Sequence, residues 1–161
     1  MPPYRRISNL IDSIWNFGFI EGSDWPQDIE LTPQHLGLVS DGQNRIFWPL
    51  TPDRIDPSAL QKIIPALNTT HFNLLDSTNT QVAALGASAS IAGSLYVSEY
   101  QHGGRGRRGR SWISPYARNL AMSLGMATQR PLNELGGLSL VVGLALADAL
   151  EALGVKDIDL K

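Results

Sequence analysis

The chain has 161 residues, of which 43% are hydrophobic and 17% charged, and it is long enough for one domain and a small second one. Its formal net charge of -2 argues against a protein that is basic overall and coats nucleic acid, but leaves room for a local basic site. The absence of cysteine excludes disulfides, thiolate nucleophiles and zinc–thiolate clusters, and we expect a cytoplasmic protein.

Residues 1–68 predict a helix, several short strands and a second helix. The first helix covers residues 4–17, where apolar side chains recur at helical spacing, and Gly18 ends it. Residues 19–50 hold short apolar pieces between turn residues, which predicts small strands or a wing. These pieces lie at residues 19–20, 29–31, 38–39 and 46–48. Asp56 then opens the second helix.

From residue 72 the pattern alternates between strand and helix. Strands are expected at residues 72–75, 94–100, 119–127 and 155–160, and helices at residues 78–85 and about 132–153. Gly86 is expected to close the shorter helix in a left-handed conformation. In the third strand four apolar side chains share one face, namely Leu120, Met122, Leu124 and Met126.

Residues 135–153 are nearly apolar and long enough to approach a membrane span. Asp148 and Glu151 share one helical face near its end, and three glycines weaken it as a span. We therefore predict a buried helix packed on a sheet, and no membrane partner.

The stretch EYQHGGRGRRGRSW, residues 99–112, is called the Arg/Gly loop below; it places four arginines among four glycines between two predicted strands. Glycine lets the backbone approach a ligand, and arginine matches phosphate or carboxylate oxygens. A loop that wraps an anion is therefore the favoured interpretation. A nucleic-acid contact, a nuclear-import signal and a solvated loop remain the alternatives. The Walker pattern GxxxxGK[ST] is absent, and a dinucleotide fingerprint does not fit, because a strand and not a helix follows the loop.

The sequence DSTN at residues 76–79 begins the helix predicted at 78–85. Thr78 and Gln81 have the spacing of a capping box, which satisfies amides at a helix start. Polar side chains at that position can also hold a neutral polar ligand.

These motifs together resemble those of the biotin protein ligases. They are DSTN at 76–79, the Arg/Gly loop, NLAMSL at 119–124 and GLSLVVGLALADALEALG at 137–154. The nearest pattern is the bacterial bifunctional ligase and biotin-operon repressor, and it covers residues 51–161 well and residues 4–50 weakly.

The resemblance implies an α+β (mixed α/β) fold, with the N-terminal half of a class II synthetase-like biotin/lipoate ligase catalytic domain in residues 69–161. Residues 51–68 would form a connecting helix, and residues 1–50 an incomplete winged helix-turn-helix. Because the chain stops before the family's Trp-Pro-Asn-Asp motif, we expect a fragment truncated at both ends, with its long apolar helix incompletely covered.

On the biotin side, the resemblance assigns Ser77, Thr78 and Asn79 to the ureido ring of biotin and Gln101 to the biotin and adenylate site. Lys161 matches the lysine that meets the reacting carboxylate and phosphate.

On the adenylate side, Gly104, Arg105, Gly106 and Arg107 match the loop core that orders over biotinyl-adenylate and contacts its phosphate. Trp112 matches the tryptophan that closes over the nucleotide. Arg105, Arg107 and Lys161 are the expected catalytic residues, because each would stabilise the charge of the reacting phosphate.

The implied reaction joins ATP and biotin into biotinyl-5′-AMP and then transfers biotin to a lysine of the biotin carboxyl carrier protein. Mg²⁺ is expected with ATP. No protein metal site is predicted, because His35, His71 and His102 lack ligand spacing, and His102 is expected to face solvent. A lipoate or octanoate ligase is an alternative, although the Arg/Gly loop favours biotin.

The other implied function is that of a transcriptional repressor with biotinyl-5′-AMP as co-repressor, acting as a homodimer on operator DNA. Residues 4–17 resemble a recognition helix, from which Arg5, Arg6, Ser8 and Asn9 would face DNA.

Overall fold

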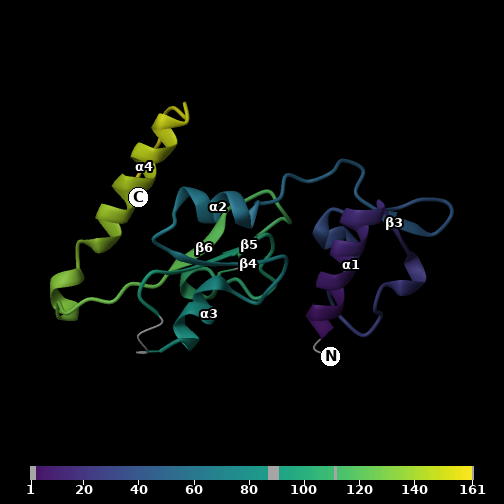
Figure 1. Ribbon diagram of the computed structural model, residues 1–161, viewed down its shortest axis with the longest axis horizontal. Helices are drawn as coiled ribbons and strands as arrows, with labels where there is room; N and C mark the ends of the chain where they lie inside the picture. Colours follow the sequence, from purple (N-terminus) through teal and green to yellow (C-terminus); the bar gives the residue numbers. More distant parts are fainter. Residues whose placement is uncertain (1–2, 87–90, 111, 161) are drawn as a thin grey trace. The chain divides into compact units, whose positions relative to one another are not determined.

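The computed structural model describes residues 3–86, 91–110 and 112–160 (Figure 1). The chain divides into two compact units, Met1–Ala127 and Thr128–Lys161.

The first unit begins with helix α1, Pro3–Phe17. Ile7, Ile11 and Ile14 recur every three or four residues, so they share one helical face, and all three are buried. Gly18 ends the helix as predicted, at a φ of +90° that glycine adopts without strain, and its N–H donates to the carbonyl oxygen of Ile14.

An antiparallel sheet in the order β1-β3-β2 follows, formed by β1 (Ile20–Glu21), β2 (Val39–Ser40) and β3 (Arg45–Phe47). The short 3₁₀ helices η1 (Gly22–Asp24) and η2 (Pro33–Leu36) lie between β1 and β2. Buried side chains of this region form one core with those of α1, including Ile20, Trp25, Leu36, Leu38 and Ile46.

The strand piece predicted at residues 29–31 is wrong. Leu31 is buried, but its carbonyl oxygen accepts a hydrogen bond of 3.1 Å from Nε1 of Trp25. The apolar side chain and the carbonyl group are therefore satisfied without a partner strand.

Helix α2, Pro57–Ile63, starts where the sequence places it. Its N-cap is Asp56, whose carboxylate accepts a hydrogen bond from the backbone N–H of Ser58, and Pro57 occupies the first turn, where no N–H is needed.

The second sheet has the order β4-β5-β6, with β4 at Asn68–Phe72, β5 at Ser94–Ser98 and β6 at Ala121–Leu124. Strands β4 and β5 are parallel and are joined through helix α3, Thr78–Ala84, whereas β6 is antiparallel to β5. Helix α2 packs beside β4 and α3 packs against β5 and β6, and Figure 1 shows the two helices on opposite sides of the sheet.

Strand β4 ends near the residue where the prediction began it. The predicted strand was 72–75, yet pairing with β5 runs from Asn68 to Phe72, and only Leu75 forms a further isolated bridge, to Gln101. The polar residues Asn68, Thr69 and Thr70 lack the apolar pattern that marks a strand in sequence.

The alternation in β6 is confirmed, with Ala121 buried on one face. The four apolar residues of the other face are exposed, namely Leu120, Met122, Leu124 and Met126.

The second unit holds the 3₁₀ helix η5, Leu132–Leu135, and helix α4, Leu138–Ala152. No described residue of α4 is buried, so the prediction of a buried helix is wrong for this structure. No strand occurs in the described part of this unit against which the helix could pack. By length and composition, Asn133–Ala152 is the one described helical segment apolar enough to cross a membrane.

The strand predicted at 155–160 is absent. The N–H of Val155 donates to the carbonyl oxygen of Leu150 and thereby closes the end of α4, and Leu160 lies against Gly143 instead of pairing with a strand.

We expect Ile11→Ala to lower the free energy of unfolding by about 2–5 kcal/mol, because it leaves a cavity beneath α1. Urea unfolding measures the change. The control Asn16→Ala, at an exposed position of the same helix, should stay within about 0.5 kcal/mol of the wild type. Equal stability of the two variants would contradict the assignment of Ile11 to the core.

Candidate ligand site

The start of α3 is built from polar side chains that satisfy one another. Ser77 is the N-cap, and its hydroxyl accepts a hydrogen bond from the N–H of Thr80. Gln81 donates from Nε2 to Oδ1 of Asp76 at 2.8 Å. The predicted capping box of Thr78 and Gln81 is therefore wrong, because the cap lies one residue earlier and Gln81 reaches past it.

The carboxyl group of Asp76 is held in its ionised form. Burial works to raise its pKa, but the hydrogen bonds from Gln81 and from backbone N–H groups outweigh burial and leave the pKa below the usual value. This places a negative charge immediately before the N-terminus of α3.

Thr78 joins three elements of the sheet region. Its backbone N–H and its hydroxyl both donate to Oε1 of Gln101, at 2.8 and 3.1 Å, and the hydroxyl lies 2.9 Å from that of Ser123 in β6. Thr78 is only 3% exposed and Ser77 only 8%, whereas Asn79 is exposed. Among the described residues, Nε2 of Gln101 has no hydrogen-bond acceptor, so it remains available to a ligand.

The Arg/Gly loop begins beside this cluster. The N–H of His102 donates to the carbonyl oxygen of Leu75 at 3.0 Å, and that of Gly103 to the carbonyl oxygen of Asp76 at 2.8 Å. A Cβ at position 103 would lie 3.2 Å from the same Asp76 oxygen, so this approach favours glycine. The loop is thus fixed at its start to the segment that leads into Ser77.

Further along, the Arg/Gly loop folds back on itself. The N–H of Gly106 donates to the carbonyl oxygen of Arg110 at 2.9 Å, and the chain turns at Arg108, which has a φ of +60°. Trp112 lies so close to Gly104 that a Cβ there would be 2.6 Å from Cδ1 of the indole. Trp112 is 55% exposed, which leaves indole surface that a ligand can contact.

The predicted cationic residues differ in how the structure places them. The guanidinium of Arg105 donates to the hydroxyl of Thr80 in α3 at 3.1 Å. Arg107 belongs to a short 3₁₀ turn, Arg107–Gly109. Lys161 lies outside the described residues.

His102 does not face solvent as predicted. Its ring stacks on that of Tyr4 in α1, with centroids 3.6 Å apart and planes inclined by 7°. Burial lowers the pKa of His102, and the nearby carboxylate of Asp76 offsets only part of this effect. No local pattern predicts the contact, because the two residues are far apart in sequence.

The sequence also gave no sign that Glu99, the first residue of the Arg/Gly loop, is buried and paired with His71. Glu99 is 1% exposed, and its Oε1 accepts from the N–H of Ile55 and lies 2.8 Å from Nε2 of His71, each at hydrogen-bond distance. This pair fixes the chain entering α2 to the sheet, directly before Tyr100 and Gln101.

The residues predicted to face DNA divide into two groups. Arg6 forms an ion pair of 2.6 Å with Asp28, and the hydroxyl of Ser8 accepts a 3.5 Å hydrogen bond from Asn73. Arg5 and Asn9 are exposed on α1.

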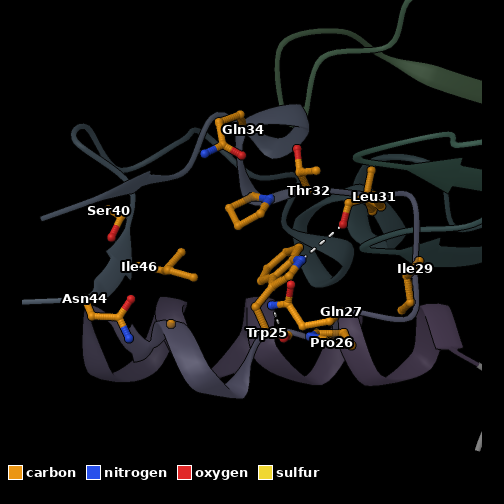
Figure 2. A pocket seen from close by; sticks show the side chains of 12 residues that line it. Trp25, Pro26, Gln27, Ile29, Leu31, Thr32, Gln34, Ser40, Asn44 and Ile46 are labelled. Atoms are coloured by element: carbon orange, nitrogen blue, oxygen red, sulfur yellow. Dashed lines mark hydrogen bonds between the residues drawn. The ribbon is translucent and has the colours of Figure 1, made fainter.

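A cavity of about 290 Å³ lies beside β1–β3, and it is lined by none of the residues predicted to bind biotin or adenylate. Figure 2 shows Trp25 among the side chains that line it, together with Thr32, Gln34, Asn44 and Ile46. No ligand contact is predicted from the sequence for any of its lining residues. Within the ranges that the structure describes, no three His, Asp or Glu side chains cluster as a metal site, so no ligand for Mg²⁺ is named.

Comparison with known proteins finds a family match over the part of the chain that contains Thr78 and the Arg/Gly loop. Residues 71–161 match the model of the biotin/lipoate A/B protein ligase family. The chain is 35% identical over 99 residues, 62% of its length, to the bifunctional ligase/repressor BirA of Salmonella typhimurium and equally to that of Escherichia coli. It is 38% identical over 79 residues, 48% of its length, to the biotin–[acetyl-CoA-carboxylase] ligase of Mycobacterium tuberculosis. These matches cover only 28–30% of the relatives' own lengths.

The lowered pKa of His102 predicts a pH dependence of stability. Between the folded-state pKa and about 6.5, the unfolded chain binds more protons at His102 than the folded chain does. The contribution of His102 to the free energy of unfolding is therefore fully present above pH 6.5, and it is lost as the pH falls toward the folded-state pKa. We expect His102→Gln to lose less stability than the wild type between pH 7.5 and 5.5 in urea unfolding. Equal losses would contradict the assignment.

Proposed function

Because the chain belongs to the biotin/lipoate A/B protein ligase family, we propose that it forms the biotin-binding part of a biotin–protein ligase. The observation that carries this proposal is the convergence of Thr78, Gln101 and Ser123 beside the Arg/Gly loop. Neutral donors and acceptors suit the ureido ring of biotin, and guanidinium groups on the adjoining loop suit a phosphate.

In the proposed reaction, a carboxylate oxygen of biotin attacks the α-phosphorus of ATP, and the bond from that phosphorus to pyrophosphate breaks. The product is biotinyl-5′-AMP. The amine of a lysine on the biotin carboxyl carrier protein of acetyl-CoA carboxylase then attacks the acyl carbon, and AMP leaves. Mg²⁺ would accompany the ATP phosphates.

Negative charge accumulates where the carboxylate meets the α-phosphate. Arg105, Arg107 and Lys161 would stabilise this charge electrostatically, and fixed positioning of the two reactants would supply further acceleration. Ordering of the loop, with Trp112 over the nucleotide, would keep water from the mixed anhydride.

Biotin is preferred over lipoate or octanoate as the substrate. The family includes both ligase types, but the Mycobacterium tuberculosis relative, whose name states a ligase substrate, is a biotin ligase. Titration calorimetry with biotin and with lipoate distinguishes the two.

A second candidate function is repression at operator DNA in the cytoplasm, by a homodimer with biotinyl-5′-AMP as co-repressor. Two relatives are named as bifunctional ligase/repressors, and Arg5 and Asn9 are exposed on α1, the helix that would enter the major groove.

For the ligase proposal, we expect Arg105→Ala and Arg107→Ala in the full-length protein each to weaken retention of biotinyl-5′-AMP about tenfold or more, the range of a hydrogen bond to a charged group. Release of labelled adenylate into an unlabelled chase measures it. Arg130→Ala, which removes an exposed arginine outside the loop, is the matched control. Unchanged retention in both loop variants would refute the loop assignment.

For the repressor proposal, Arg5→Ala should weaken binding to operator DNA and reduce the slope of log affinity against log salt by about 1, as expected for one lost phosphate contact. Fluorescence anisotropy at several salt concentrations measures both quantities. Binding that is equally strong for unrelated DNA would count against a repressor.

A further inference from the structure

We propose that Tyr4 is a positioning residue for the Arg/Gly loop. Its ring stacks on that of His102, a contact called the clasp below, and thereby holds the start of the loop beside Ser77 and Thr78. This inference rests on the proposed function, because it concerns the Arg/Gly loop to which that function assigns the binding of biotinyl-5′-AMP. It assigns to the N-terminal helix a direct part in the ligand site.

The contact itself is close and extensive. The two rings are nearly parallel, inclined by 7°, with centroids 3.6 Å apart, so one face of the imidazole is covered by the phenol ring. The stack removes one face of each ring from water, and this burial stabilises the contact. Both residues are half-buried, and Tyr100, the residue two positions before His102, packs against the same core as Tyr4.

On the loop side, the clasp acts on a segment that leads to the ligand residues. The N–H groups of His102 and Gly103 donate to the carbonyl oxygens of Leu75 and Asp76, the two residues before Ser77. A shift of the His102 ring would therefore strain both hydrogen bonds. Gly104, which contacts the indole of Trp112, follows directly.

On the helix side, α1 is fixed well enough to hold a ring in place. Nδ2 of Asn73 donates to Oδ1 of Asp12 at 2.8 Å, and the guanidinium of Arg54 lies over the ring of Trp15, 4.8 Å from its centroid. The apolar face of α1 shares its core with Leu74, which lies shortly before α3, and with Tyr116, which lies shortly after the Arg/Gly loop. Tyr4 thus projects from an anchored helix.

The clasp predicts that either ring is needed for slow release of the adenylate. In the full-length protein, we expect Tyr4→Ala and His102→Ala each to release biotinyl-5′-AMP about three- to tenfold faster, the factor that an aromatic pair supplies. The double variant should be no faster than either single variant, because both substitutions remove one interaction. Tyr4→Phe, which keeps the ring, should behave as the wild type, and so should Asn16→Ala.

Several results would overturn the clasp. They are unchanged release in Tyr4→Ala, effects of the two single variants that multiply in the double variant, and a defect that Tyr4→Phe shares with Tyr4→Ala. The last result would assign the effect to the hydroxyl group instead of the stacked ring.

A second measurement separates failure of the clasp from failure of the proposed function. Hydrogen exchange of the Gly103 amide, which is bonded to Asp76, should be about three- to tenfold faster in Tyr4→Ala without any ligand present. A wild type that retains no biotinyl-5′-AMP refutes the ligase proposal, while faster exchange still supports the clasp. Unchanged exchange refutes the clasp whatever the ligand.

Discussion

The parallel pairing of β4 with β5 is the constraint on which the ligand site depends. Because Phe72 pairs with Ser98, both strands reach the same edge of the sheet together, and the chain leaves that edge at two adjacent points. The isolated bridge between Leu75 and Gln101 lies three residues further in the same register and brings the segment before α3 against the start of the Arg/Gly loop. A shift of one residue in this register would separate Thr78 from Gln101.

Several polar groups of the site are already hydrogen-bonded to one another, which has an energetic consequence for a ligand that uses them. Oε1 of Gln101 takes two hydrogen bonds from Thr78, and Arg105 is bonded to Thr80. A ligand that uses these groups exchanges existing hydrogen bonds for new ones, so its net gain from each is small. Selectivity between ligands then depends on how many of these hydrogen bonds the entering molecule replaces. A molecule that replaces only some of the hydrogen bonds leaves buried polar groups unpaired.

Local patterns predicted those features that neighbouring residues determine. The apolar spacing of α1, the caps at Asp56 and Gly18 and the extent of α3 are properties of a few consecutive side chains, and all were predictable. The stack of His102 on Tyr4 and the buried Glu99 depend on distant contacts, so nothing nearby in sequence marks them. The capping-box prediction failed for a related reason: Thr78 and Gln81 fit the local pattern, but the backbone N–H and the hydroxyl of Thr78 donate to Gln101 instead, a contact 23 residues away in sequence.

The contacts of α1 also bear on how the chain folds while it is being synthesised. The apolar side of α1 packs on residues such as Ile20, Trp25 and Ile46, which follow it closely. Its polar side does not, because Asp12 bonds to Asn73, 61 residues later. At ribosomal rates of about 5–20 residues per second, this partner arrives roughly 3–12 s after the helix. The N-terminal region therefore assembles most of its core early, and it acquires Leu74, Tyr116 and the hydrogen bond to Asn73 in a separate, later step.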